Sequence, residues 1–200
     1  MEKRSLMVRL IITAAVGLAV LAAVAAAVTA IILRRRCRRL LADELAPLSG
    51  RAVDEMAERK PTFTMTTTAR FAASPDRIWG GLEEGAFSWM PFIPGVRYPH
   101  AERGIGTVRK LDTVFFAADE QVLHHDPGRR LTVVGIRTSI PLFVQSYVAD
   151  FRLEQSGGGT EVIWTVGGRP ALFAFVPLSW TAPLIRPFAR VVLQRLATRI

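Results

Sequence analysis

The feature that most constrains this chain is an uncharged apolar run, residues 10–33, with five arginines among the six residues that follow it. As a helix, its 24 residues would be about 36 Å long. The hydrocarbon core of a bilayer is about 30 Å thick, so such a helix can span it with a modest tilt. The sequence therefore predicts a transmembrane helix over residues 10–33, after a short N-terminal tail, residues 1–9.

A secretory signal peptide is the alternative, because it also combines a basic start with an apolar run. Lys3, Arg4 and Arg9 supply the start, and alanines near the end of the run resemble a cleavage site. However, the run exceeds the usual apolar region of about 7–15 residues, and arginines follow it instead of a neutral segment. A retained anchor is favoured.

Basic residues flank the run unequally, with three before it and five after it. Cytoplasmic flanks of membrane helices carry an excess of Lys and Arg. We therefore expect a single-pass membrane protein whose globular part lies in the cytoplasm.

The net charge of +9, from 26 Lys and Arg against 17 Asp and Glu, is also typical of nucleic-acid-binding proteins. Seven of these nine positive charges belong to residues 1–39, which makes anionic membrane lipids their natural partner. The rest of the chain shows no basic stripe with interleaved aromatic residues, so nucleic-acid binding is disfavoured.

Cys37, among the arginines, is the single cysteine, which excludes an intramolecular disulfide. It could be a lipidation site. A free thiol on the cytoplasmic face is the preferred interpretation.

Residues 34–61 read as a basic juxtamembrane segment and connector. The anchor helix is expected to continue until Pro47 stops it, and Ser49 is expected to begin a short helix that ends at Glu58. From residue 62 the periodicity predicts one strand, a short helix, several further strands and a terminal helix. The strands are expected at 62–71, 98–102, 107–111, 115–125, 130–138, 143–155 and 160–166, and the helices at 75–84 and from 183.

This order predicts an α+β domain over residues 62–200. Antiparallel strands must bury their apolar face against another layer. The terminal helix, with apolar residues at helical spacing, is the element long enough to cover it. These residues are Leu184, Ile185, Phe188, Val191, Val192 and Leu196.

Five short segments of this region share their order and spacing with one known superfamily. They are residues 73–79 (ASPDRIW), 89–96 (WMPFIPGV), 104–109 (GIGTVR), 126–131 (DPGRRL) and 158–164 (GGTEVIW). Together they resemble the SRPBCC superfamily, which is START-like or Bet v 1-like, and above all its polyketide cyclase/dehydrase and lipid-transport branch. The resemblance covers about residues 62–200 and implies a helix-grip fold, a curved antiparallel sheet of about six to seven strands wrapped around a long C-terminal helix.

Proteins of this kind enclose an elongated apolar cavity for lipids, polyketides, sterols or other hydrophobic molecules. The superfamily has no shared catalytic motif, so no catalytic residue is carried over. Residues 171–183 depart from the common pattern because they are unusually apolar and twice interrupted by proline. We hypothesise that this segment dips into the bilayer surface.

Candidates for metal or acid–base chemistry are few. His124 and His125 are neighbours on a predicted strand, so they point to opposite faces and cannot both hold one ion. Solvated histidines are the preferred interpretation, and the acidic pairs 83–84 and 119–120 are expected at the surface. We predict no metal site, no cofactor and no catalytic residue.

A ligand cavity needs polar groups that fix orientation. Tyr147 and Asp150 point to opposite faces by strand alternation, which leaves Arg137 and Tyr147 to orient a ligand headgroup. Apolar members of the set could equally be core residues. The expected lining is Trp89, Met90, Phe115, Arg137, Tyr147, Phe151, Trp164, Phe188 and Val192.

The sequence thus predicts membrane-anchored binding, transport or presentation of a hydrophobic or amphipathic small molecule such as a lipid or polyketide. One alternative is a cyclase or dehydratase-type enzyme, which would lose turnover without Arg137 or Tyr147. A second alternative is a ligand-free scaffold that regulates a membrane partner.

Overall fold

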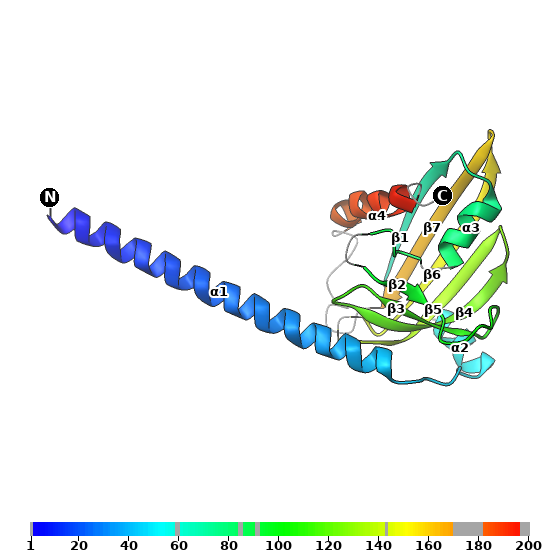
Figure 1. Cartoon of the computed structure of the whole chain (residues 1–200), viewed down its shortest axis with the longest axis horizontal. Coiled ribbons are helices and arrows are strands. Elements are labelled where there is room, and N and C mark those ends of the chain that lie inside the picture. The colour runs from blue at the N-terminus through cyan, green and yellow to red at the C-terminus, as the bar shows by residue number, and fades with distance from the viewer. Residues whose placement is uncertain are drawn as a thin grey trace.

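The computed structural model describes residues 2–58, 61–83, 86–90, 93–142, 144–169 and 182–196, except for the side chains of residues 2–11, 57 and 182–188. Figure 1 shows a long N-terminal helix that projects from a domain in which helices flank one curved sheet.

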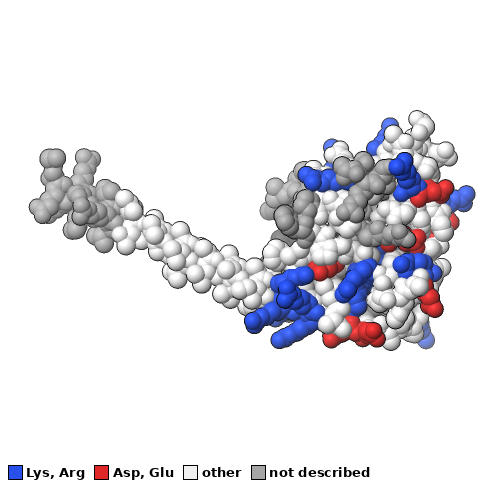
Figure 2. Space-filling model, viewed as in Figure 1, with Lys and Arg blue, Asp and Glu red and all other residues white. Residues whose placement is uncertain are grey.

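The long helix, α1, runs from Glu2 to Ala42, so the apolar run and the arginines after it form one continuous helix. Over Ile12–Ala42 its length and composition would allow it to cross a membrane. Figure 2 shows an uncharged surface along the described part of the projecting helix, and Lys and Arg side chains gathered where it meets the domain.

Among the described residues of the domain there are three more helices, α2 (Gly50–Glu58), α3 (Pro75–Glu83) and α4 (Ala182–Leu196). As expected, α2 follows Ser49, whose carbonyl accepts a hydrogen bond from Val53 N at 3.2 Å. The helix expected at residues 75–84 is confirmed as α3, whose buried side chains are Ile78, Trp79 and Leu82.

Seven strands form one antiparallel sheet in the order β1-β7-β6-β5-β4-β3-β2. The curved sheet and the C-terminal helix confirm the predicted helix-grip architecture (Figure 1). The strands are β1 (Phe63–Phe71), β2 (Gly95–Arg97), β3 (Val108–Asp112), β4 (Ala117–Asp126), β5 (Arg130–Thr138), β6 (Ser146–Ser156) and β7 (Gly159–Arg169).

The prediction of a strand at residues 98–102 was wrong, since the corresponding strand, β2, ends at Arg97. Local contacts of Arg103 hold the following residues in an irregular loop. Its guanidinium lies 4.0 Å from the centre of the Tyr98 ring, and its Nη1 donates a 2.7 Å hydrogen bond to the carbonyl of His100.

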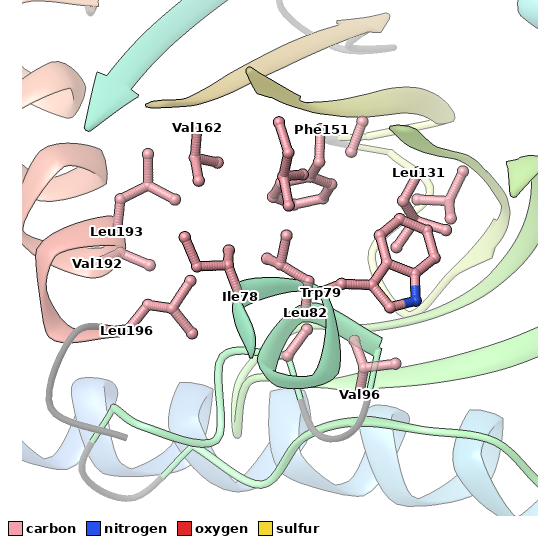
Figure 3. Packing of buried hydrophobic residues seen from close by; sticks show 14 of the residues in the cluster. Ile78, Trp79, Leu82, Val96, Leu131, Phe151, Val162, Val192, Leu193 and Leu196 are labelled. Carbon is pink, nitrogen blue, oxygen red and sulfur yellow. The ribbon is translucent and has the colours of Figure 1, made fainter. Parts of the chain in front are cut away.

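The core lies between the concave face of the sheet and the helices α3 and α4. In Figure 3, Val192, Leu193 and Leu196 of α4 point toward the sheet beside side chains of α3. On β6 and β7, Phe151 and Val162 are among the side chains buried in this core. Trp89, in the segment between α3 and β2, also contacts α4, because its Nε1 donates a 2.7 Å hydrogen bond to the carbonyl of Val192.

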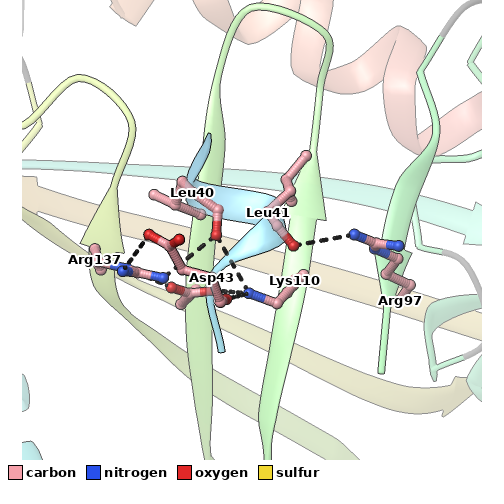
Figure 4. Close-up of polar contacts among 7 residues, drawn as sticks. Leu40, Leu41, Asp43, Arg97, Lys110 and Arg137 are labelled. Atoms are coloured by element: carbon pink, nitrogen blue, oxygen red, sulfur yellow. Dashed lines mark hydrogen bonds and ion pairs between the residues drawn. The ribbon is translucent and has the colours of Figure 1, made fainter. Parts of the chain in front are cut away.

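The opposite face of the sheet holds the end of α1. Lys110 of β3 donates to the carbonyls of Leu40 (3.4 Å) and Asp43 (2.6 Å), and Arg137 donates to the carbonyl of Leu40 (3.3 Å), as Figure 4 shows. Cations suit the unpaired carbonyls and the negative dipole end of a helix C-terminus. These contacts coincide with the end of α1 at Ala42, before the expected end at Pro47.

Cys37 also belongs to this junction. Its side chain is fully buried against Leu40 and Ala117, with Sγ 3.5 Å from Ser139 Oγ. The expected free thiol is therefore enclosed between α1 and the sheet, because the C-terminal turns of α1 pack on the domain instead of remaining a solvated spacer.

Candidate functional site

A fully buried ion pair lies on the concave face of the sheet. Arg109 of β3 and Glu120 of β4 are direct cross-strand partners. Arg109 Nε donates to Glu120 Oε2 at 2.7 Å, and the two side chains are only 1% and 2% exposed. A buried ion pair contributes little net stability, because desolvation offsets its attraction. Its presence therefore calls for an explanation other than stability.

Tyr147 of β6 extends this pair. Its hydroxyl donates a 2.5 Å hydrogen bond to Glu120 Oε1. The ring lies against Gly135 of β5, where a Cβ atom would collide with the ring carbons. Only glycine allows this close approach, so Gly135 leaves the space that the Tyr147 ring occupies.

Buried polar atoms without a partner in hydrogen-bonding geometry lie on the same side of the sheet. Among the residues that the structure describes, Arg109 Nη1 and the Tyr98 hydroxyl are two of them, although the two side chains lie close enough to interact with each other and to shift each other's pKa. Across the sheet, Thr67 Oγ1 and Trp164 Nε1, on directly paired residues of β1 and β7, are in the same condition. Leaving a buried polar group unsatisfied costs about 1–3 kcal/mol. These groups are suited to hydrogen-bonding a polar atom that does not belong to the described protein.

The interior keeps both tyrosine hydroxyls protonated. Burial, reinforced by the Glu120 carboxylate, raises the pKa of Tyr147 well above its ordinary value. Burial also raises the pKa of Tyr98, although the nearby Arg109 opposes the shift. Burial disfavours the charged form of Arg109, but Glu120 and Tyr98 outweigh this and raise the pKa of Arg109. The cluster thus presents a guanidinium and neutral phenols.

This environment predicts an alkaline titration that can be measured directly, because Tyr98 and Tyr147 are the two tyrosines of the chain. At pH 10 a free tyrosine is about half ionised. We expect much less tyrosinate absorbance from the folded protein at that pH. Since folding favours the protonated phenols, their stabilising contribution is present below about pH 10 and is lost as pH rises toward the folded pKa values. Tyrosinate absorbance equal to that of the denatured chain at pH 10 would contradict the prediction.

Most residues expected to line a cavity lie in or beside the core. Trp89, Phe151 and Val192 belong to the buried cluster, and Met90, Tyr147 and Trp164 pack against it. The rings of Phe151 and Trp164 are stacked, with centroids 5.5 Å apart and planes 6° apart. The ligand-lining role of these side chains stays a prediction.

Phe115 and Phe188 are placed differently. Phe115 is 51% exposed in the turn before β4, while its neighbour Phe116 packs against the core, 6.0 Å from the Tyr147 ring. The side chain of Phe188, together with residues 171–181 and hence most of the segment expected at the bilayer surface, lies outside the described residues.

Arg137 faces away from the core because of a β-bulge. On β4, Glu120 pairs with Gly135 and Asp119 pairs with Arg137, so Ile136 is an extra residue on β5. Strict alternation would put Arg137 on the same face as Gly135, but one extra residue reverses the phase. Arg137 instead donates to Asp119 Oδ2 at 2.7 Å on the outer face.

The expectation that residues 119 and 120 are surface acids was wrong, since Asp119 and Glu120 are 0% and 2% exposed. Glu83 is also partnered, accepting from Trp79 Nε1 at 2.8 Å and lying 2.5 Å from His125 Nε2. His125 is thus largely enclosed, while His124 is exposed. Across the described residues, no three His, Cys, Asp or Glu side chains are grouped to hold a metal ion.

Arg109, Glu120 and Tyr98 were missed as site residues. A signal was present for the first two: Arg109 shares a strand face with the apolar Leu111, and Glu120 shares one with Ala118 and Val122. Opposite charges at apolar-face positions of adjacent strands indicate a buried pair. Tyr98 carried no such signal, because it lies in the loop that was predicted as a strand.

The sheet, the long C-terminal helix and the polar groups on the concave face define a helix-grip protein. The sequence matches the family model described as polyketide cyclase/dehydrase and lipid transport over residues 62–200, and the chain belongs to this family. No curated protein matches the sequence.

Solved structures share the fold at low sequence identity. A START superfamily protein from Mycobacterium smegmatis aligns with a TM-score of 0.56 and 16% identity, covering 68% of this chain and 96% of that chain. Ara h 8.0201 and a protein from Thermus thermophilus each have a TM-score of 0.55, with 13% and 14% identity, and the same coverage of 68% and 96%. These similarities establish the fold alone.

Proposed function

We propose that the domain binds an amphipathic small molecule, such as a lipid or polyketide, whose apolar body contacts the aromatic residues of the concave face and whose polar end meets Arg109 and Tyr98. The observation that carries this proposal is the unpartnered Nη1 of Arg109 on a side chain buried from solvent. The family, described as polyketide cyclase/dehydrase and lipid transport, supports a hydrophobic ligand.

The polar end of the ligand is constrained by the cluster. Arg109 and Tyr98 lie close enough to shift each other's pKa, and both can donate, so one oxygen could accept from both. A charged donor inside a poorly solvated site makes strong hydrogen bonds. Because Glu120 balances the charge of Arg109, the ligand oxygen need not be ionised, and a carbonyl or hydroxyl serves as well as a carboxylate.

The apolar body would contact aromatic side chains. The Phe87 ring lies 5.5 Å from both Trp89 and Trp164, and Trp164 stacks on Phe151. Pockets for small molecules are mostly lined by such side chains, with a few polar groups that fix orientation. Trp164 Nε1 adds a further unpartnered donor on the same face.

Membrane anchoring is the second part of the proposal. Residues 10–33 of α1 would cross the bilayer, residues 34–61 would connect, and the domain over 62–200 would lie on the cytoplasmic side, where the arginines are favoured. The length and apolar composition of α1 support the span. Anchoring would let the domain take its ligand from the adjacent bilayer.

The test is native mass spectrometry, with extraction of bound small molecules, on the full chain expressed in cells. We expect a co-purifying amphipathic molecule with the wild type and its loss from R109M/E120Q, which removes the buried pair. The matched control is R130M/D150N, which removes an ion pair from the outer face of the same sheet (2.8 Å). Equal retention by all three proteins, or an empty wild type, would overturn the proposal.

A further inference from the structure

A pocket of about 350 Å³ lies where α1 meets the domain. Arg34, Arg38 and Leu41 line it from α1, Arg97 lines it from β2, and Asp112 lines it from β3. Arg34 and Arg38 are one helical turn apart and therefore share a face of α1. Three guanidinium groups thus surround one concavity and outnumber its single carboxylate.

Asp112 holds part of this arrangement in place. Arg34 Nη1 donates to both oxygens of Asp112, at 2.7 and 3.0 Å, and to the carbonyl of Val114 at 3.3 Å. Within the described part of the chain all three bonds start from Nη1, so the rest of the guanidinium is not committed. The arginine is positioned without being fully neutralised.

The other two arginines supply the remaining charge. Arg97 Nη2 donates a long, 3.4 Å hydrogen bond to the carbonyl of Leu41, which places its guanidinium beside α1 (Figure 4). Arg38 is exposed, and its side chain makes no hydrogen bond or ion pair with the residues that the structure describes. Together with Arg34 and Asp112, they leave a surplus of two positive charges around the pocket.

The position of the pocket along α1 matches the headgroup layer of a membrane. The apolar run ends at Leu33, so Arg34 and Arg38 follow it by about 1.5 and 7.5 Å along the helix. The headgroup region extends roughly 5–8 Å beyond the hydrocarbon core on each side. The pocket therefore opens at the depth at which phosphate groups lie.

We propose that this pocket binds the phosphate headgroup of an anionic phospholipid. Guanidinium groups bind phosphate oxygens in fixed bidentate geometry, which a diffuse basic flank does not provide. The inference rests on the proposed anchoring of α1. It adds a specific lipid site that is separate from the interior ligand site at Arg109, on the other face of the sheet.

The experiment uses the full chain in neutral detergent with equal amounts of phosphatidylglycerol and phosphatidylcholine, read by native mass spectrometry. We expect wild type to retain phosphatidylglycerol preferentially, and R38Q/R97Q to retain about thirtyfold less, from roughly 1 kcal/mol for each of the two arginines removed. The control R35Q/R36Q also removes two positive charges, from α1 next to the pocket but outside its lining. R38Q alone should show an intermediate loss without altering the Arg97–Leu41 contact.

Equal losses in R38Q/R97Q and R35Q/R36Q, or no preference for phosphatidylglycerol, would overturn the lipid site. Displacement of the lipid by millimolar inorganic phosphate would assign the pocket to a free anion and also overturn it. Co-flotation of the full chain with phosphatidylcholine liposomes tests the anchor separately. If the chain floats but shows no headgroup selectivity, only the lipid site is overturned. If the chain does not float, the proposed anchoring is overturned.

Discussion

Replacing Glu120 with glutamine is expected to lower the free energy of unfolding by about 3–5 kcal/mol, the range for breaking a buried ion pair by removing one partner. The substitution keeps an oxygen that can accept from Tyr147, but it leaves the charge of Arg109 buried without a counter-charge. The decrease in the free energy of unfolding therefore measures the cost of the uncompensated charge rather than the loss of a contact. Urea denaturation followed by tryptophan fluorescence measures it.

The double variant R109M/E120Q separates charge from packing. Methionine removes the guanidinium while filling a similar volume, so we expect most of the lost stability to return. Binding of a ligand that depends on Arg109 should nevertheless not return in the double variant. If E120Q were as stable as the wild type, the pair would not be enclosed as the structure places it. If the double variant were no more stable than E120Q, the penalty would come from packing.

Replacing Asp119 with alanine is expected to release the end of α1 from the sheet. Asp119 is fully buried and accepts from Lys110 Nζ at 3.0 Å and from Arg137 Nε at 2.7 Å, the two cations that hold the terminal carbonyls of α1. Without it, Lys110 loses its counter-charge in a poorly solvated junction and Arg137 keeps only the exposed Asp43, 3.4 Å away, at a total cost of about 3 kcal/mol. Hydrogen exchange of the amides at residues 36–43 should then accelerate roughly a hundredfold.

The control for this experiment is D150A. Asp150 also accepts from two arginines on the outer face, Arg130 and Arg152, each at 2.8 Å, but it does not contact α1. D150A should leave exchange at residues 36–43 near the wild-type rate. Similar acceleration in both variants would indicate general destabilisation of the sheet and would contradict a specific role of Asp119 at the junction.

The two substitutions test opposite faces of one sheet. Asp119 and Glu120 are sequence neighbours, so they point to opposite sides of β4. Asp119 therefore binds cations at the junction with α1, and Glu120 binds Arg109 in the interior cluster. This division explains how a single acidic pair, read from sequence as a solvated surface feature, belongs to two separate buried networks.

Local patterns in the sequence determined most of the elements. The alternation of β1 and the apolar stripe of α3 each follow from side-chain period, which needs no knowledge of neighbours. The hairpin between β6 and β7 follows from its glycines. The apolar run of α1 likewise depends on composition alone, and the five short segments indicated the family.

Only the tertiary structure decided which side chains meet. The bulge at Ile136 reverses the alternation of β5, so Arg137 lies on the outer face instead of the interior face. Such a one-residue insertion cannot be recognised from the hydrophobic pattern of the sequence. The pairing of Arg109 with Glu120 depends on the register of two strands. The sequence by itself determined most of the elements, the long apolar segment and the fold family, because these depend on local periodicity and composition. The structure alone decided the polar cluster and the arginine pocket, because each depends on contacts between segments far apart in the chain.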